Sequence, residues 1–177
     1  MEAKRKLTRR LAEVNQVRID LLDELQDLDH AELIARPIPD KWSILEIVEH
    51  LVLVEEAFLG ALDPDRDEPL RRSWKHAILY RVVMLILRFD IPVQVPARAM
   101  VPAGEAGLSE LRSRWDESQR RLRAFAEGLN PRDLKAPVAA HPVAGPMTPG
   151  QSVAMLDVHL RRHIRQIRKR LGLLASG

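Results

Sequence analysis

The sequence predicts an all-α fold, a helical bundle with one or two long connections. Three observations support this class. Apolar residues recur every three or four positions along five segments, which is the period of a helix with one buried face. Capping signals mark the start of two of these segments, and proline-rich stretches that cannot continue a helix separate them. No segment shows the alternating pattern of a convincing strand.

The first predicted helix runs from about Lys4 to Leu28. Its apolar residues form one stripe: Leu7, Leu11, Val14, Val17, Leu21, Leu22 and Leu25. The prolines of the segment 36–40 then predict an extended connection. The second helix begins at Ser43, because Ser43 and Glu46 have the spacing of a capping box. It ends near Asp63-Pro64, and its inward residues are Ile44, Ile47, Val48, Leu51, Val54, Phe58 and Leu62.

The third predicted helix covers roughly Leu70 to Arg88. Its run from Ile78 to Leu87 is apolar almost all round, which indicates either deep burial or a subunit contact. A contact in a homodimer is the favoured interpretation. The segment 89–107 contains Pro92, Pro96 and Pro102, so it predicts a long crossover loop.

The fourth helix covers roughly Leu108 to Leu129, and its inward residues are Leu111, Trp115, Leu122, Phe125 and Leu129. A second proline-rich, irregular stretch follows. The last helix starts at Thr148, because Pro149 suits the first helical position and Gln151 completes a capping box. It is predicted to reach about Leu171, with Gly172 as its C-cap.

Composition narrows the function classes. A chain of 177 residues suits one domain, here residues 1–177. A formal net charge of +3 and few aromatic residues argue against a nucleic-acid partner. No apolar run is long enough for a bilayer, and no signal-like segment follows the basic N-terminus, so we expect a cytoplasmic protein without a membrane partner. The absence of cysteine excludes a thiol nucleophile within this chain.

Three histidines carry the strongest chemical signal. His159 and His163 are four residues apart, so they lie on one face of the last helix, and both imidazoles can reach one ion. His50 lies on the inward face of the second helix. Three neutral histidines with an open fourth position are one way to hold a catalytic zinc ion. In the alternative interpretation, His50 is a hydrogen-bonded core residue and the other two lie at the surface.

Two motifs resemble a known family. The segment 42–51, WSILEIVEHL, resembles the W-S-x-x-E-x-x-x-H-L signature of the DinB-like (damage-inducible protein) superfamily, of the DinB/YfiT type. The segment 159–167, HLRRHIRQI, is similar to its H-x-x-x-H-x-x-Q-I signature, and the segment 141–148 resembles the loop that often precedes that helix. The resemblance spans about residues 10 to 172.

This resemblance implies a four-helix bundle with a long crossover and an extra short helix, often dimeric. It also implies a divalent metal ion, usually zinc or nickel, held by His50, His159 and His163. Some members of the family are transferases or isomerases that use a low-molecular-weight thiol as cosubstrate, such as bacillithiol or mycothiol. The family name records induction by DNA damage and does not imply binding to DNA.

Other polar residues near the histidines have two interpretations each. Gln166 shares the face of His159 and His163 and could hydrogen-bond a ligand imidazole, or it could belong to a polar network between helices. Glu46 could orient His50 or act as a base, although its capping box already explains it. Glu49 is expected to face solvent, and Trp42 to pack before its helix.

The remaining histidines and the basic residues are weaker candidates. His30 and His76 read as surface or interface residues, and His141 could line the mouth of the site. Six basic residues of the last helix are predicted to form mostly a solvated face, from which one or two could attract an anionic cosubstrate. They are Arg161, Arg162, Arg165, Arg168, Lys169 and Arg170.

Two functional hypotheses follow. In the first, the protein is a metal-dependent enzyme that transfers a small thiol to an electrophilic small molecule, or hydrolyses a substrate with metal-bound water. Any sulfur nucleophile must then come from a cosubstrate, because the chain has no cysteine. In the second, it is a non-enzymatic metal-binding stress protein or an interaction module. This second hypothesis is favoured because the sequence assigns no residue as a general base.

Overall fold

The computed structural model describes residues 2–62, 70–91 and 98–176, and within them the chain is almost entirely helical. The helices are α1 (Glu2–Gln26), α2 (His30–Ile34), α3 (Ile44–Gly60), α4 (Trp74–Arg88), the short 3-10 helix η1 (Arg98–Met100), α5 (Leu108–Gly128) and α6 (Pro149–Leu174). One hairpin, β1 (Ala139–His141) and β2 (Gly145–Met147), precedes α6. The all-α class is therefore confirmed.

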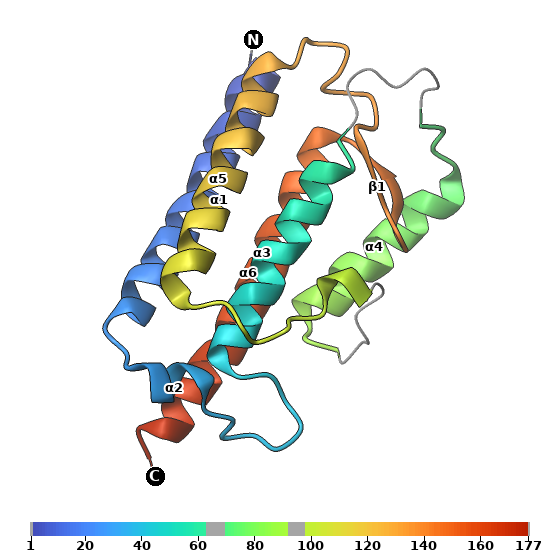
Figure 1. The fold of residues 1–177 in the computed structure, drawn as a ribbon. Helices are drawn as coiled ribbons and strands as arrows, with labels where there is room; N and C mark the ends of the chain where they lie inside the picture. Colours follow the sequence, from blue (N-terminus) through green and yellow to red (C-terminus); the bar gives the residue numbers. More distant parts are fainter. Residues whose placement is uncertain (1, 63–69, 92–97, 177) are drawn as a thin grey trace.

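Helices α1, α3, α5 and α6 form a four-helix bundle (Figure 1). In cross-section, α3 lies beside α5 and α6, and α1 completes the ring by packing against the same two helices. Figure 1 also shows that α3 and α5 run in the same direction, so the chain must return along the bundle between them. The segment that contains α4 and η1 makes this return, and α4 packs on the outer side of α6.

The core contains the inward stripes of the four bundle helices. Because each stripe recurs with the helical period, all four converge on one axis, and their side chains exclude water from it. The largest fully buried side chains are Trp115, Leu22, Leu25, Ile44, Ile47, Leu111, Ile167, Val48 and Val52. The inward residues predicted for α1, α3 and α5 either belong to this core or pack against it.

Capping boxes fix the starts of three helices. Ser43 and Glu46 exchange two hydrogen bonds at the start of α3, of 2.7 and 3.2 Å, as predicted. Thr148 and Gln151 do the same for α6. The third box opens α2, where Asp29 caps the backbone of Glu32. The periodicity analysis did not predict α2, although the D-x-x-E spacing is a readable signal.

Two predicted helix boundaries were wrong. Helix α4 begins at Trp74 rather than at Leu70, after Ser73 as its N-cap. Helix α6 continues through Gly172 to Leu174 and closes at Ala175. Leu171 and Leu174 pack against the core, and this packing outweighs the cost of one glycine within the helix, which is about 1 kcal/mol. The predicted stop at Asp63-Pro64 and the crossover residues Pro92 and Pro96 lie outside the described residues.

The hairpin before α6 was not expected. Its strands are three residues long, which is too short to show an alternating pattern, and they pair in antiparallel register with Ala140 opposite Pro146. His141 Nδ1 accepts hydrogen bonds from the backbone of Val143 and Ala144 and so holds the turn. Gly145 has a φ of +70° and lies against the ring of His76, so a side chain has no room there.

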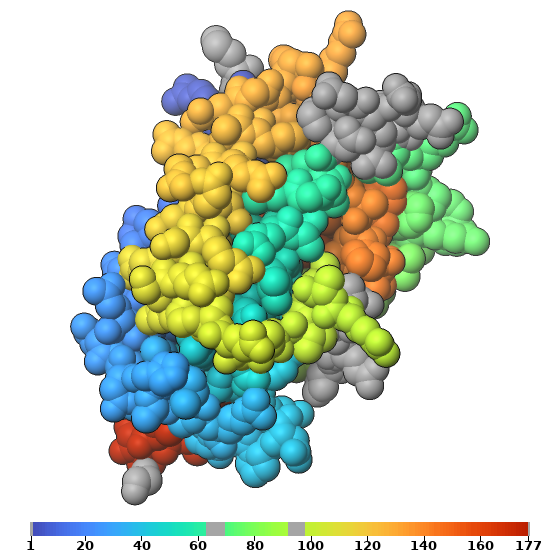
Figure 2. Space-filling model, viewed as in Figure 1, coloured from blue at the N-terminus to red at the C-terminus, as the bar shows by residue number. Residues whose placement is uncertain are grey.

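The crossover packs over α3. Figure 2 shows the segment after η1, in yellow-green, lying across the surface of α3 before it joins α5. Glu49 anchors this segment, because its carboxylate accepts hydrogen bonds from the backbone of Ala103 (3.2 Å) and Gly104 (2.8 Å). The expectation that Glu49 faces solvent is therefore wrong. It is buried because the crossover covers this part of α3.

Helix α4 is buried on one side only. Val83 and Leu87 pack with Met147 and Met155 between α4, the hairpin and α6. The opposite side exposes large apolar residues, namely Trp74, Ile78, Leu79, Val82, Leu85 and Phe89. Deep burial of the whole helix is thus excluded, and the subunit contact stays a prediction. In the part of the chain that the structure describes, no helix has both the length and the hydropathy to cross a membrane.

Candidate metal centre

The three predicted histidines meet inside the bundle. His50 stands in the second turn of α3, and His159 and His163 stand one turn apart on α6, which packs beside α3. The ring centroids are 4.6 to 5.3 Å apart. One nitrogen from each ring lies within 4.8 Å of the other two. We call His50, His159 and His163 the histidine cluster.

The backbone of η1 orients His50. Its Nδ1 lies 2.7 Å from the carbonyl oxygen of Met100. A carbonyl oxygen can only accept, so Nδ1 carries the proton and Nε2 keeps its lone pair. The ring of Trp42 lies against His50, with the centroids 4.9 Å apart, and it also packs against the core before α3 begins, as predicted. The crossover therefore fixes which nitrogen of His50 is free.

A chain of hydrogen bonds orients His163. Gln166 Nε2 donates to Asp90 Oδ1 (3.0 Å), so the amide oxygen must face His163, whose Nδ1 donates to it (2.9 Å). Arg162 Nε forms a 2.8 Å ion pair with the same oxygen of Asp90. Asp90 follows α4 with a φ of 54°, a conformation uncommon outside glycine. The prediction that Gln166 could bond a ligand imidazole is thus met in the geometry, while Asp90 was missed.

The two histidines of α6 face each other. His159 Nε2 and His163 Nε2 are 3.2 Å apart. Because the proton of His163 lies on Nδ1, its Nε2 has a lone pair directed at His159. Either a proton on His159 Nε2 bridges the pair, or a cation lies against both nitrogens. Two nitrogens that bind one zinc ion at about 2.0 to 2.1 Å in a tetrahedral arrangement are about 3.3 Å apart, so the spacing suits such an ion.

Burial keeps all three imidazoles neutral. Desolvation lowers the pKa of His163 to about 3, with smaller effects of His50 and Arg162, although the bond to Gln166 opposes it. Desolvation also lowers the pKa of His159, well below its usual value, and nearby positive charges add to the effect. The pKa of His50 falls for the same first reason. Neutral imidazoles are the form that binds metal ions.

The basic residues of α6 divide into two groups. Arg161, Arg165, Arg168 and Lys169 are exposed, as the predicted solvated face requires. Arg162 and Arg170 are buried, which that prediction missed. Arg162 donates to Asp90 and to the carbonyl of Ile91, and Arg170 donates to the carbonyls of Trp42 and Gln166. Both therefore fasten neighbouring segments around the histidine cluster.

The other candidates lie apart from the converging nitrogens. Both carboxylate oxygens of Glu46 are engaged, one with the backbone of Ser43 and one with Arg36. His30 is exposed at the start of α2. His141 is near enough to contribute to the lowered pKa of His159, but its Nδ1 is used within the hairpin turn.

The donor set fits a divalent metal ion. Imidazole nitrogens are common ligands of zinc and nickel, and the neutral rings here present their Nε2 atoms from two rigid helices. Two of the three Nδ1 atoms already have oxygen partners, which is the usual support for a histidine ligand. Three protein ligands also leave coordination positions for a substrate.

Comparison with known families agrees with the geometry. A family model described as the DinB superfamily matches residues 13–167. This range includes all of the bundle except residues 2–12 of α1 and residues 168–174 of α6, and it includes all three histidines of the cluster. Comparisons with curated proteins and with solved structures give no match.

Proposed function

Because the chain belongs to the DinB superfamily and brings three neutral histidines together, we propose that it is a divalent-metal-dependent enzyme. Its reaction would transfer a low-molecular-weight thiol to an electrophilic small molecule. The metal ligands would be His50, His159 and His163, and zinc or nickel would suit them best. Gln166 would support His163 from outside the coordination sphere.

The observation that carries the proposal is the convergence of lone pairs. The Nδ1–H groups of His50 and His163 both point outward to oxygen acceptors. Their Nε2 lone pairs therefore point inward, toward His159. A buried group of acceptors without donors is unfavourable unless a cation satisfies it. A proton on His159 Nε2 would satisfy the lone pair of His163, but the lone pair of His50 would still have no donor among the described residues.

The chain itself prepares the site for an anionic nucleophile. A bound divalent ion would act as a Lewis acid that favours the thiolate form of a thiol. The guanidinium of Arg162 adds to the lowered pKa of all three histidines, after the larger effect of desolvation. Asp90 neutralises part of this charge, and the remainder would favour an anionic ligand on the metal ion. The thiol must come from a cosubstrate, because the chain contains no cysteine.

Metal analysis of protein purified without a histidine tag tests the first part. We expect about one zinc or nickel ion per chain, or uptake of one on addition. Protein that neither contains nor takes up such an ion would refute the proposal. Metal-loaded protein should then be assayed with small thiols and electrophiles together. Turnover of an ester or amide without any thiol would assign hydrolysis instead of transfer.

A non-enzymatic role is the second candidate, and one observation favours it. The carboxylates nearest His50 in the sequence are both engaged elsewhere, Glu46 in the helix cap and Glu49 with the crossover. Neither serves as a free general base. If metal-loaded protein turns over no substrate in a broad thiol and electrophile screen, a metal-binding stress or interaction protein becomes the better description.

We also propose that the exposed side of α4 mediates a homodimer. Ile78, Val82, Leu85 and Phe89 are 39% or more exposed and recur with the spacing of a helix–helix contact. Helix α4 carries basic residues and no acidic ones, so two copies would repel one another at low salt. We expect a dimer that strengthens with salt and that Val82→Glu dissociates. Light scattering coupled to size-exclusion chromatography measures this, with Arg120→Gln, an exposed change on α5, as control.

A further inference from the structure

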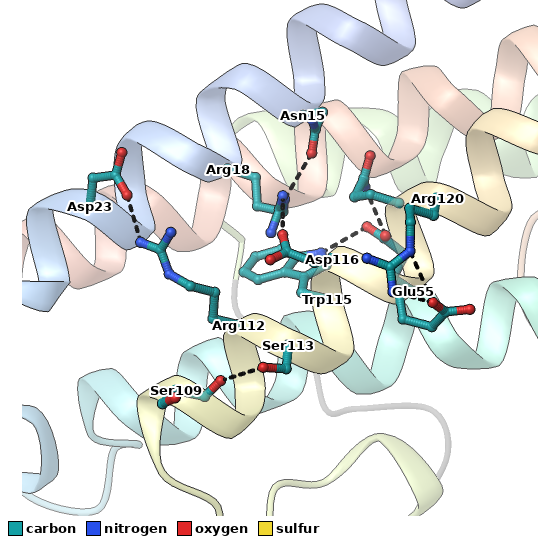
Figure 3. Close-up of polar contacts among 12 residues, drawn as sticks. Asn15, Arg18, Asp23, Glu55, Ser109, Arg112, Ser113, Trp115, Asp116 and Arg120 are labelled. Carbon is teal, nitrogen blue, oxygen red and sulfur yellow. Dashed lines mark hydrogen bonds and ion pairs between the residues drawn. The ribbon is translucent and has the colours of Figure 1, made fainter.

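A second buried polar group lies between α3 and α5. Glu55 of α3 is 5% exposed, and its two carboxylate oxygens accept hydrogen bonds from Trp115 Nε1 (2.9 Å) and Gln119 Nε2 (2.7 Å) of α5. Figure 3 shows Glu55 and Trp115 joined in this way between their helices. We call Arg18, Glu55, Trp115 and Gln119 the Glu55 cluster. The proposed metal chemistry does not use it.

Arg18 brings a buried positive charge to the Glu55 cluster. Its guanidinium is 5.6 Å from the centre of the Trp115 ring, and it forms a 2.6 Å ion pair with Asp116 and a 2.9 Å hydrogen bond with Asn15 (Figure 3). Its Nη1 is buried and has no hydrogen-bond partner among the described residues. An unpaired buried donor is costly, so a cluster of this kind favours a polar occupant nearby.

A cavity connects the two buried polar groups. Its walls come from all four helices of the bundle, and they include Arg18, Glu55, Gln119 and His159 among apolar side chains. The cavity has space for about one water molecule. His159 therefore belongs to both places, because its Nε2 faces His163 and its ring also forms part of the cavity wall.

His159 differs from the other two histidines at Nδ1, the ring nitrogen that does not face the histidine cluster. The Nδ1 of His50 has the Met100 carbonyl as acceptor, and the Nδ1 of His163 has Gln166. For His159, the hydrogen bonding within the described part of the chain is confined to Nε2. Histidine ligands almost always donate their outer N–H to a carboxylate, a carbonyl or a water molecule. The cavity is where His159 can find such an acceptor.

We propose that one water molecule in this cavity accepts the Nδ1–H of His159 and donates to the Glu55 carboxylate, which makes Glu55 a positioning residue of the metal centre. This proposal rests on the proposed three-histidine site. The water would complete a second hydrogen bond by donating to the Gln119 amide oxygen, because the amide nitrogen is already used by Glu55.

The chemistry of Glu55 agrees with this role. Burial raises its pKa to about 7, although the bonds from Trp115 and Gln119 act in the opposite direction. Two donors therefore do not fully offset the loss of solvent around the carboxylate. A further donated hydrogen bond from a buried water molecule, and the positive charge of an ion beyond His159, would both favour the ionised acceptor.

Glu55→Gln tests the proposal, with Glu56→Gln as the matched control. Both changes remove one carboxylate charge from adjacent residues of α3, but Glu56 pairs with Arg114 on the outside of the bundle. The measurement is the zinc dissociation constant by competition with a chromophoric chelator, on protein that circular dichroism shows to be folded. We expect about tenfold weaker binding for Glu55→Gln and no change for Glu56→Gln.

The outcomes separate this proposal from the one on which it rests. Unchanged zinc affinity in folded Glu55→Gln overturns the role of Glu55 and leaves the three-histidine site intact. Loss of zinc uptake by the wild-type protein overturns both. If Glu55→Gln does not fold, an atomic-resolution crystal structure of the zinc-loaded wild type decides. A water molecule between His159 Nδ1 and Glu55 supports the proposal, and a direct protein acceptor on His159 Nδ1 overturns it.

Discussion

The histidine cluster and the Glu55 cluster are buried in the same bundle but have opposite chemistry. In the histidine cluster, ring nitrogens with lone pairs converge, and their N–H groups point away. In the Glu55 cluster, N–H donors converge on one carboxylate. Burial acts on both in the same way, since it favours the neutral form. It lowers the pKa of His163 to about 3 and raises the pKa of Glu55 to about 7.

The difference shows which buried group needs a partner from outside. The carboxylate of Glu55 already has two donors from α5 and the nearby charge of Arg18. The inward nitrogens of the histidine cluster have no donor except one another among the described residues. The protein itself therefore supplies the main partners of the Glu55 carboxylate, whereas a cation would satisfy the converging nitrogens of the histidine cluster. Each prediction below changes a residue of one cluster or a direct partner of it.

The largest effect is expected from His159→Ala. This change removes one of three proposed ligands, so we expect no measurable zinc or nickel binding. The helical fold should persist, because only one of many buried side chains is truncated. Metal content by mass spectrometry and helicity by circular dichroism check both statements. His30→Ala, at an exposed position, is the control. Wild-type metal content in His159→Ala would contradict the assignment.

Trp115→Ala removes a member of the Glu55 cluster instead. Trp115 is 2% exposed, so its truncation leaves a large cavity and removes one donor from Glu55. We expect a loss of about 3 to 5 kcal/mol in the free energy of unfolding, measured by urea denaturation of metal-free protein. Val143→Ala truncates an apolar side chain that is 47% exposed in the hairpin turn, and should change stability by less than about 0.5 kcal/mol. Equal losses in the two variants would contradict the burial argument.

The pH dependence of stability isolates Glu55. Its pKa is about 7 in the folded protein, against 4.5 for an unperturbed glutamate. The folded state therefore holds a proton that the unfolded chain releases, and this contribution disappears as the pH rises from 4.5 through 7. The difference of about 2.5 pKa units corresponds to about 3 kcal/mol.

Glu55→Gln removes this titration but leaves the histidines in place. The free energy of unfolding of the wild type minus that of Glu55→Gln should therefore fall between pH 4.5 and 7, and stay level above about pH 8. Urea denaturation at several pH values, in the presence of a chelator, measures the difference. A difference that stays level over this range would show that Glu55 is already ionised in the folded protein and would contradict the raised pKa.

The sequence predicted the histidine cluster better than the Glu55 cluster, for a physical reason. The spacing of His159 and His163 and the inward position of His50 made a shared site one of two interpretations, and the resemblance to the DinB-like superfamily then identified the three residues as a set. Glu55 stands beside Glu56 in α3, and two adjacent acids resemble a solvated surface. Only the position of Trp115 and Gln119 on the facing helix α5 reveals that Glu55 is buried.

The fold was predictable to a similar degree. Periodicity and capping boxes located the four bundle helices, because those signals are local. The hairpin and the anchoring of the crossover by Glu49 depend on contacts between distant segments, which a single sequence does not display. The role of Asp90 also depends on a contact between distant segments. Its link to the histidine cluster exists only because α4 ends beside α6, where Arg162 and Gln166 can reach it.

The smallest effect is expected from Gln166→Ala, which tests whether a hydrogen bond from outside the proposed ligand set orients His163. The change removes the acceptor of His163 Nδ1–H and the link to Asp90, but no proposed ligand. Zinc should bind about tenfold more weakly, because the ring of His163 is no longer held in one orientation. Lys169→Ala, an exposed change on the same helix, should leave the dissociation constant unchanged. Equal zinc affinity in Gln166→Ala and wild type would mean that helix packing alone orients His163. The hydrogen bonds that Asp90 accepts from Arg162 and Gln166 would then serve only to hold the end of α4 against α6.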